Sequence, residues 1–96
     1  MKKNLENIEL QTDIMREGNV YIAYSPALDL SSCGDTAEDA KKSFKEAARL
    51  FIETIVKMGT YKEVLLDLGW QEKKGEMLPP LIISREMISI PFPVLA

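Results

Sequence analysis

Hydrophobic and polar residues alternate along the first third of the chain, as in the strands of a half-buried sheet. Ile8, Leu10 and Ile14 share one parity and polar residues fill the other, so this stretch predicts a first strand. Residues 16–19 contain Gly-Asn, a sequence that is typical of turns. Val20–Ser25 is rich in β-branched and aromatic residues, which favour a returning strand. The pattern therefore predicts a β-hairpin.

A proline turn separates this hairpin from a short third strand. Pro26 cannot donate a hydrogen bond to a strand ladder, so it should end or kink the second strand. Leu28 and Leu30 then alternate with polar neighbours, which predicts a third strand that closes at Gly34.

A long amphipathic helix follows. Thr36 is a strong N-cap candidate, and Asp39 lies where a capping box places its acidic or amide partner. We expect the helix to run from residue 37 to about 58 and to stop at Gly59. Its apolar residues fall at spacings of three and four, in one stripe: Ala37, Ala40, Phe44, Ala47, Phe51, Ile55 and Met58.

Thr60 and Glu63 form a second potential capping box, which predicts a shorter helix that ends at Gly69. Trp70 comes directly after it and is expected to fold back onto the core. Residues 71–76 predict a charged loop or a short extended piece.

The C-terminal stretch 81–94 should be extended. Pro91 and Pro93 share one parity, so both remove N–H groups that would point to the same side. A strand can tolerate this only where that side is unpaired, which predicts an edge strand or a tail. Four apolar residues hold the other parity: Ile88, Ile90, Phe92 and Val94.

The element order β-β-β-α-α-β predicts an α+β fold, in which one long helix packs on one face of an antiparallel, three- to four-stranded sheet. Ninety-six residues make a single domain, 1–96. We place its core at 4–70 and an extended C-terminal segment at 78–96. A domain this small buries a modest share of its surface, so a dimer is a reasonable expectation.

Composition narrows the classes of function. The chain has no histidine, one cysteine and a net charge of −3, a balance that argues mildly against a nucleic-acid binder. With Cys33 alone, no intramolecular disulfide can form, which suits a reducing cytoplasm. No apolar run approaches the ~20 residues of a membrane helix. We expect a cytoplasmic binding module with no catalytic residue, no metal and no cofactor.

Several short motifs occur in a specific order: Tyr21-Ile22-Ala23, Pro26-Ala27-Leu28, Gly34-Asp35-Thr36 with its alanine-rich helix, then Leu68-Gly69-Trp70 and Pro79-Pro80. Together they resemble the core of the HicB-type antitoxins, in particular a small single-domain branch, over most of the chain. The resemblance implies a partial ribonuclease-H-like fold and a homo-oligomer, either a dimer or a tetramer. It also implies that the chain neutralises a HicA-type toxin, a small basic RNA-cleaving protein, by covering its active surface.

The chain departs from this family at its C-terminal end. Many HicB proteins carry a DNA-binding helix-turn-helix or ribbon-helix-helix there, whereas residues 70–96 lack helical periodicity and contain four prolines. We therefore expect no direct DNA binding, and a stand-alone regulatory or structural module without a toxin is an alternative.

Three groups of side chains have a chemical and a structural interpretation. Carboxylates near the strands could hold metals as in a ribonuclease H, or could simply form the polar side of a sheet. Cys33 could be a reactive thiol near a helix N-terminus or a small strand-end residue. Basic residues on the long helix could contact phosphates or pair with interleaved glutamates. The carboxylates are Glu9, Asp13, Asp29 and Asp35. The basic residues are Lys41, Lys42, Lys45 and Arg49.

The face of the sheet away from the helix, or an edge strand, is the natural place for a dimer or partner contact. Tyrosine is enriched at such interfaces. Core packing and an interface explain the candidate residues about equally well: Tyr21, Tyr24, Pro26, Leu28, Leu30, Ile88, Ile90 and Phe92.

Overall fold

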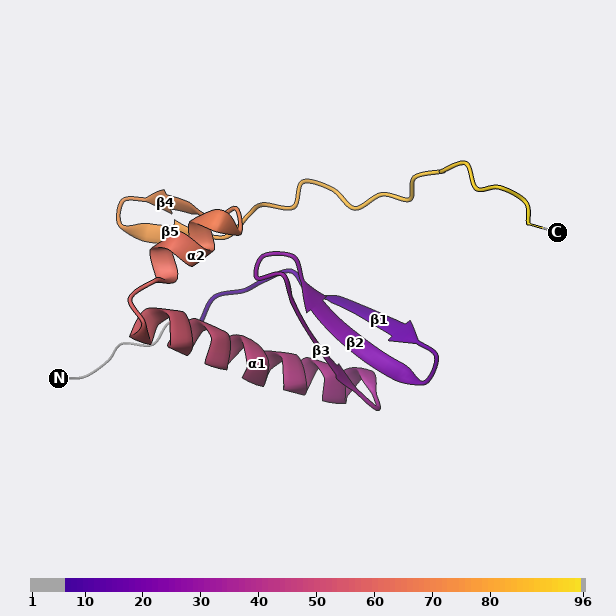
Figure 1. Cartoon of the computed structure of the whole chain (residues 1–96), viewed down its shortest axis with the longest axis horizontal. Coiled ribbons are helices and arrows are strands. Elements are labelled where there is room, and N and C mark those ends of the chain that lie inside the picture. Colours follow the sequence, from indigo (N-terminus) through magenta and orange to yellow (C-terminus); the bar gives the residue numbers. More distant parts are fainter. Residues whose placement is uncertain (1–6, 96) are drawn as a thin grey trace.

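The computed structural model describes residues 7–95 and contains two small sheets and two helices (Figure 1). The α+β class and the predicted order of the first five elements are confirmed. In chain order the elements are β1 (Asp13–Glu17), β2 (Val20–Ser25), β3 (Leu30–Gly34), α1 (Ala37–Lys57), α2 (Tyr61–Asp67), β4 (Gln71–Lys73) and β5 (Glu76–Leu78).

The main sheet is an antiparallel meander in the order β1-β2-β3. Its first turn is the predicted Gly-Asn pair, and the ladder continues up to that turn because Glu17 pairs with Val20. Gly18 has a φ of 59° there, a conformation that glycine adopts without steric cost.

The first strand begins at Asp13, so its prediction from Ile8 was wrong. Asp13 is paired with Tyr24, and β2 ends one residue later at Ser25. Residues further toward the N-terminus would lie opposite the Pro26 turn, which offers them no ladder partner. The predicted core limit of 4–70 starts in residues 4–6, which lie outside the described residues.

The third strand also begins later than predicted, at Leu30 and not at Leu28. The amide of Asp29 donates a hydrogen bond of 3.2 Å to the carbonyl oxygen of Pro26. Asp29 itself has a φ of 48°, which a strand does not permit. Residues 26–29 are therefore a closed turn, and the third strand can start only after it.

Helix α1 begins as predicted, because the Thr36 hydroxyl oxygen accepts a 3.0 Å hydrogen bond from the Asp39 amide. The apolar stripe faces the sheet, and Ala40, Phe44 and Ile55 are buried. Met58 does not belong to the buried stripe: it caps the helix and is 69% exposed.

Small residues bring α1 very close to the sheet. Ala23 on β2 and Ala40 on α1 have no exposed surface. A Cβ added to Gly34 would lie 2.6 Å from the Ala40 backbone nitrogen, far closer than real Cβ atoms approach. This contact places α1 against β2 and β3 on one face of the sheet.

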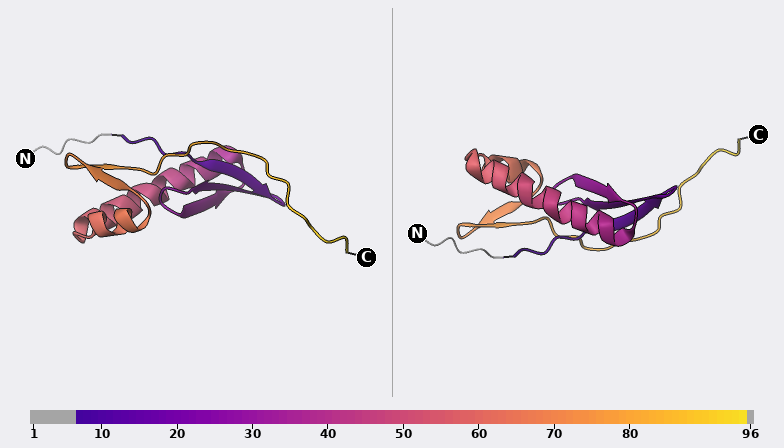
Figure 2. Two further views of the ribbon diagram at one scale, coloured as in Figure 1. Left: turned by 90° about the horizontal axis from the view of Figure 1, so that it is seen from above. Right: turned by 90° about the horizontal axis from the view of Figure 1, so that it is seen from below.

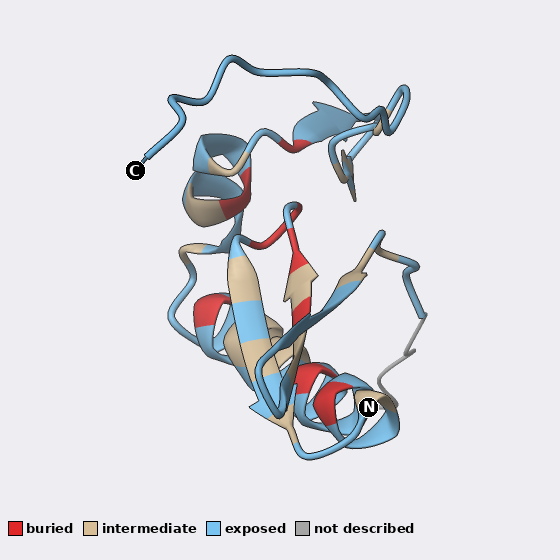
Figure 3. Cartoon of the chain, turned by 90° about the vertical axis from the view of Figure 1, so that its right-hand side faces the viewer, coloured by how far each residue is buried: buried red, intermediate tan, exposed pale blue. Residues whose placement is uncertain are grey.

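A second layer of core lies where α2 meets the β2–β3 turn, as the buried segments of Figure 3 show. Trp70 is 4% exposed, as predicted for a residue that folds back. Its indole Nε1 donates a 2.7 Å hydrogen bond to the carbonyl oxygen of Ala27. The predicted capping box of α2 does not form, because the Thr60 side chain makes no cap hydrogen bond.

The charged stretch after Trp70 forms a small hairpin of β4 and β5, where Glu72 pairs with Met77. From Pro79 to Leu95 the chain adopts no helix or strand. Of the two predictions for this segment, edge strand or tail, the structure bears out the tail. No helix within residues 7–95 is long and apolar enough to cross a membrane.

Replacing Trp70 with phenylalanine should lower the free energy of unfolding by about 1–3 kcal/mol, because a buried carbonyl loses its donor. Urea unfolding measures this, with Tyr61→Phe on exposed α2 surface as the control. A Trp70→Phe loss no larger than that of the control would show that the hydrogen bond does not secure this layer.

Replacing Gly34 with alanine should cost about 1–3 kcal/mol, since the new Cβ must displace the backbone of α1. The neighbouring exposed Cys33→Ala is the matched control and should be nearly neutral. Equal stability of the two variants would contradict the close helix–sheet contact.

Candidate functional site

Helix α1 covers one face of the main sheet, and no other helix or sheet within residues 7–95 covers the opposite face. Paired residues of neighbouring strands share a face, and successive residues alternate between faces. Ala23 and Ser25 are fully buried on the helix side, so Ile22 and Tyr24 point the other way. We call this second side the open face, and its residues are Asp13, Met15, Glu17, Val20, Ile22, Tyr24, Ser31 and Cys33.

The centre of the open face is apolar. Met15, Ile22 and Cys33 lie side by side across the three strands. Met15 is 45% exposed and Val20 is 43% exposed, while Ile22 is half-buried. Contiguous apolar surface on a protein can serve as a site of protein–protein contact, so the open face is the candidate site.

Acidic side chains border this apolar centre. Asp13 and Glu17 lie at the two ends of β1, and Asp29 lies in the turn before β3. The Tyr24 hydroxyl donates a 2.8 Å hydrogen bond to Oδ1 of Asp29. That bond, together with the nearby charges of Asp29 and Asp13, raises the pKa of Tyr24 above its ordinary value.

The same end of the open face holds the C-terminal segment, residues 79–95. Arg85 forms an ion pair with Asp13 and donates a 3.0 Å hydrogen bond to Oε1 of Gln11. The segment runs on the side of the sheet away from α1 (Figure 1). Where it leaves β5, Pro79 and Pro80 line a hollow of about 200 Å³ together with Pro26 and Leu68.

The candidate interface residues divide into two groups. Leu28 is 3% exposed and belongs to the core, and Tyr21 and Leu30 pack against the core from the helix side. The other group is accessible: Tyr24 on the open face, Pro26 in its turn, and Ile88, Ile90 and Phe92 in the C-terminal segment.

Sequence reasoning missed Met15, Val20 and Ile22 as members of an accessible apolar surface. The signal was present in the strand pattern, because Val20, Ile22 and Tyr24 have one parity and Tyr21 has the other. Their parity alone does not say which side the helix covers.

The candidate metal-binding carboxylates do not gather at one point. Asp13 is paired with Arg85, and Asp29 accepts from Tyr24. Glu9 lines the hollow beside Pro79, and Asp35 precedes α1. Within residues 7–95, no three His, Cys, Asp or Glu side chains are placed to hold a metal ion.

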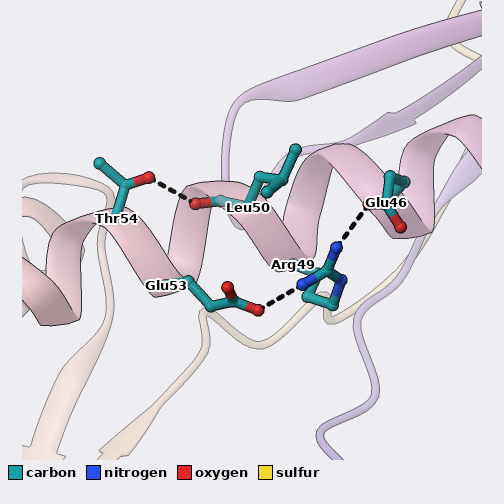
Figure 4. Close-up of polar contacts among 5 residues, drawn as sticks. All are labelled: Glu46, Arg49, Leu50, Glu53 and Thr54. Carbon is teal, nitrogen blue, oxygen red and sulfur yellow. Dashed lines mark hydrogen bonds and ion pairs between the residues drawn. The ribbon is translucent and has the colours of Figure 1, made fainter.

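Two of the four candidate basic residues of α1, Lys41 and Arg49, pair with acids of the same helix. Arg49 bonds Glu46 and Glu53, as Figure 4 shows, and these bonds raise the pKa of Arg49. Lys41 pairs with Glu38 at 3.0 Å. The pattern supports the interpretation as a solvated face. Cys33 is exposed on the open face.

Comparison of the chain with protein-family models, with curated proteins and with solved structures found no match.

The Tyr24–Asp29 hydrogen bond has a measurable consequence. Because the pKa of Tyr24 is raised, folding is favoured while Tyr24 keeps its proton, and this contribution is lost as pH rises through that higher pKa. An NMR titration of the tyrosine rings should give Tyr24 a pKa above 10.0. Asp29→Asn should lower it, and the control Asp67→Asn should not. A pKa of Tyr24 indifferent to Asp29→Asn would contradict the contact.

Proposed function

We propose that this chain is a non-catalytic protein-binding module of the HicB-like antitoxin type. In this proposal it acts in the cytoplasm as a homo-oligomer and neutralises a HicA-like RNA-cleaving toxin by occluding the toxin's active surface. The observation that carries the proposal is the open face, an apolar centre with an acidic border that no element of the described chain covers.

The charge of the open face supports a basic partner. Glu17 and Asp29 border the apolar centre, Asp13 lies beside it in an ion pair with Arg85, and the whole chain has a net charge of −3. A protein that cleaves RNA needs a basic surface to hold phosphates. Opposite charges speed the encounter of two such surfaces and favour the correct partner over wrong ones.

Blocking a toxin's active surface requires no catalytic group in this chain. A side chain that blocks a substrate surface needs shape, apolar contact and complementary charge, and it transfers no proton or electron. Tyr24 adds an aromatic ring with a polar tip, a type of side chain enriched in interface cores.

The test is inhibition of RNA cleavage by a purified HicA-like toxin from the same source cell. Addition of the full chain should stop cleavage at a fixed molar ratio. Ile22→Asp places a charge in the apolar centre and should weaken inhibition by ~30-fold or more, the effect of losing an interface hot spot. Lys45→Asp on exposed α1 is the control and should inhibit normally.

Two results would contradict the proposal. One is full cleavage in the presence of excess chain, which favours a stand-alone module. The other is inhibition that Ile22→Asp leaves unchanged, which would place the contact elsewhere. A cleavage assay with the chain alone and magnesium tests the third alternative, since RNA cleavage there would identify the chain itself as a nuclease.

A further inference from the structure

The C-terminal segment carries the largest uncovered apolar surface of the described chain. Its side chains are 73–102% exposed at eight positions, which is the exposure of an isolated peptide. The eight residues are Leu81, Ile83, Met87, Ile88, Ile90, Phe92, Val94 and Leu95. A surface of this composition is normally buried against another surface.

The backbone of this segment can pair along one side only. In an extended chain, the N–H groups of alternate residues point to the same edge. Pro91 and Pro93 have no backbone N–H, so one edge of the segment lacks two hydrogen-bond donors. The N–H groups of Ile88, Ile90 and Phe92 point to the opposite edge and can donate there. The segment is thus suited to join a single strand and to end the sheet there.

The segment cannot use its own sheet in the position it occupies. Arg85 holds it at Asp13, the first residue of β1, and from there it runs in the general direction of β1 (Figures 1 and 2). At ~3.3 Å per residue, β1 extends about 13 Å from Asp13 to Glu17, a length that an extended chain covers in about four residues. Its end lies beyond the β1–β2 turn in both figures.

The residues that need a pairing partner therefore lie past the end of the sheet that anchors them. Ile90, Phe92 and Val94 are 73%, 81% and 98% exposed. Meanwhile β1 is an edge strand of the main sheet, and its residues from Ile14 to Glu17 are all exposed. Each copy of the chain thus has an extended C-terminal segment without a pairing partner, and a free outer edge on β1.

We propose that two copies of this chain exchange their C-terminal segments, so that Met87–Leu95 of each copy pairs along the outer edge of β1 of the other. The exchange is reciprocal, and one two-fold axis satisfies both segments and both edges. Pro91 and Pro93 face outward and stop further strands from joining, so the assembly closes at two copies.

The area available is sufficient for a stable dimer. A buried aliphatic or aromatic side chain removes roughly 100 Å² of apolar surface from water. The segment Met87–Leu95 holds six such residues, so two exchanged segments would bury about 1,200 Å², the lower limit for stable specific interfaces. The inference rests on the homo-oligomer part of the proposed function and is independent of any toxin.

The first experiment measures mass in solution by light scattering of the full chain. The wild-type chain should have twice the mass of one chain. The double variant Ile90→Asp/Phe92→Asp places two charges on the side of the segment that the dimer would bury. It should have the mass of one chain. Ser89→Asp adds a charge to the same segment on the other parity and should remain a dimer. Circular dichroism and Trp70 fluorescence verify that the variants are folded.

The second experiment locates the contact by cross-linking with a short bis-maleimide. One preparation carries Ile90→Cys and the other Met15→Cys in β1, both with Cys33→Ser. A covalent pair between the two different copies is expected. Replacing Met15→Cys by Lys45→Cys on the exposed side of α1 should abolish that pair.

A wild-type chain with the mass of one copy would overturn the exchange, and so would a double-aspartate variant that stays a dimer. Cross-links confined to single chains, or equally strong with Lys45→Cys, would also overturn it. If the wild-type chain fails to inhibit RNA cleavage by the toxin, the toxin proposal is refuted. The masses and cross-links of the dimer test do not depend on that result.

Discussion

The close seating of α1 on the sheet is the constraint on which the rest of this structure depends. Gly34 has no side chain, and Ala23 and Ala40 have small ones, so the helix backbone comes within reach of the strands. A chain with one long helix can cover one face in this way. The other face, with Met15, Val20 and Ile22, is covered by no helix or sheet within residues 7–95.

Two contacts then determine what surrounds the open face. The hydrogen bond from Trp70 to Ala27 attaches α2 and the β4–β5 hairpin to the β2–β3 turn. Arg85 binds Asp13 at the start of β1 and directs the C-terminal segment past the sheet. An exposed ion pair of this kind contributes about 0–1 kcal/mol, so it marks where the segment meets the sheet and adds little to the stability of the fold. The apolar face and the apolar segment are the two surfaces that the proposals above cover with another chain.

Local chemistry made several features predictable. The Thr36 cap, the apolar stripe of α1, the end of β2 at Pro26 and the return of Trp70 all follow from neighbouring residues. The starts of β1 and β3 did not, because they depend on pairing register and on the positive φ of Asp29. The open face could not be predicted either. The contact of Gly34 with Ala40 decides which alternate residues of β2 face the helix, and it joins two separate elements. Tyr21 shows the consequence, since this candidate interface residue packs against the core on the helix side.

The central claim is that the exposed apolar parts of this chain are covered by a second chain. Amide hydrogen exchange of the full chain over a range of protein concentrations tests it most directly. The amides of Ile88, Ile90 and Phe92, and those on the outer edge of β1, should become protected together as concentration rises. Exchange of these amides at unprotected rates at every concentration, both alone and with a basic toxin, would contradict the account.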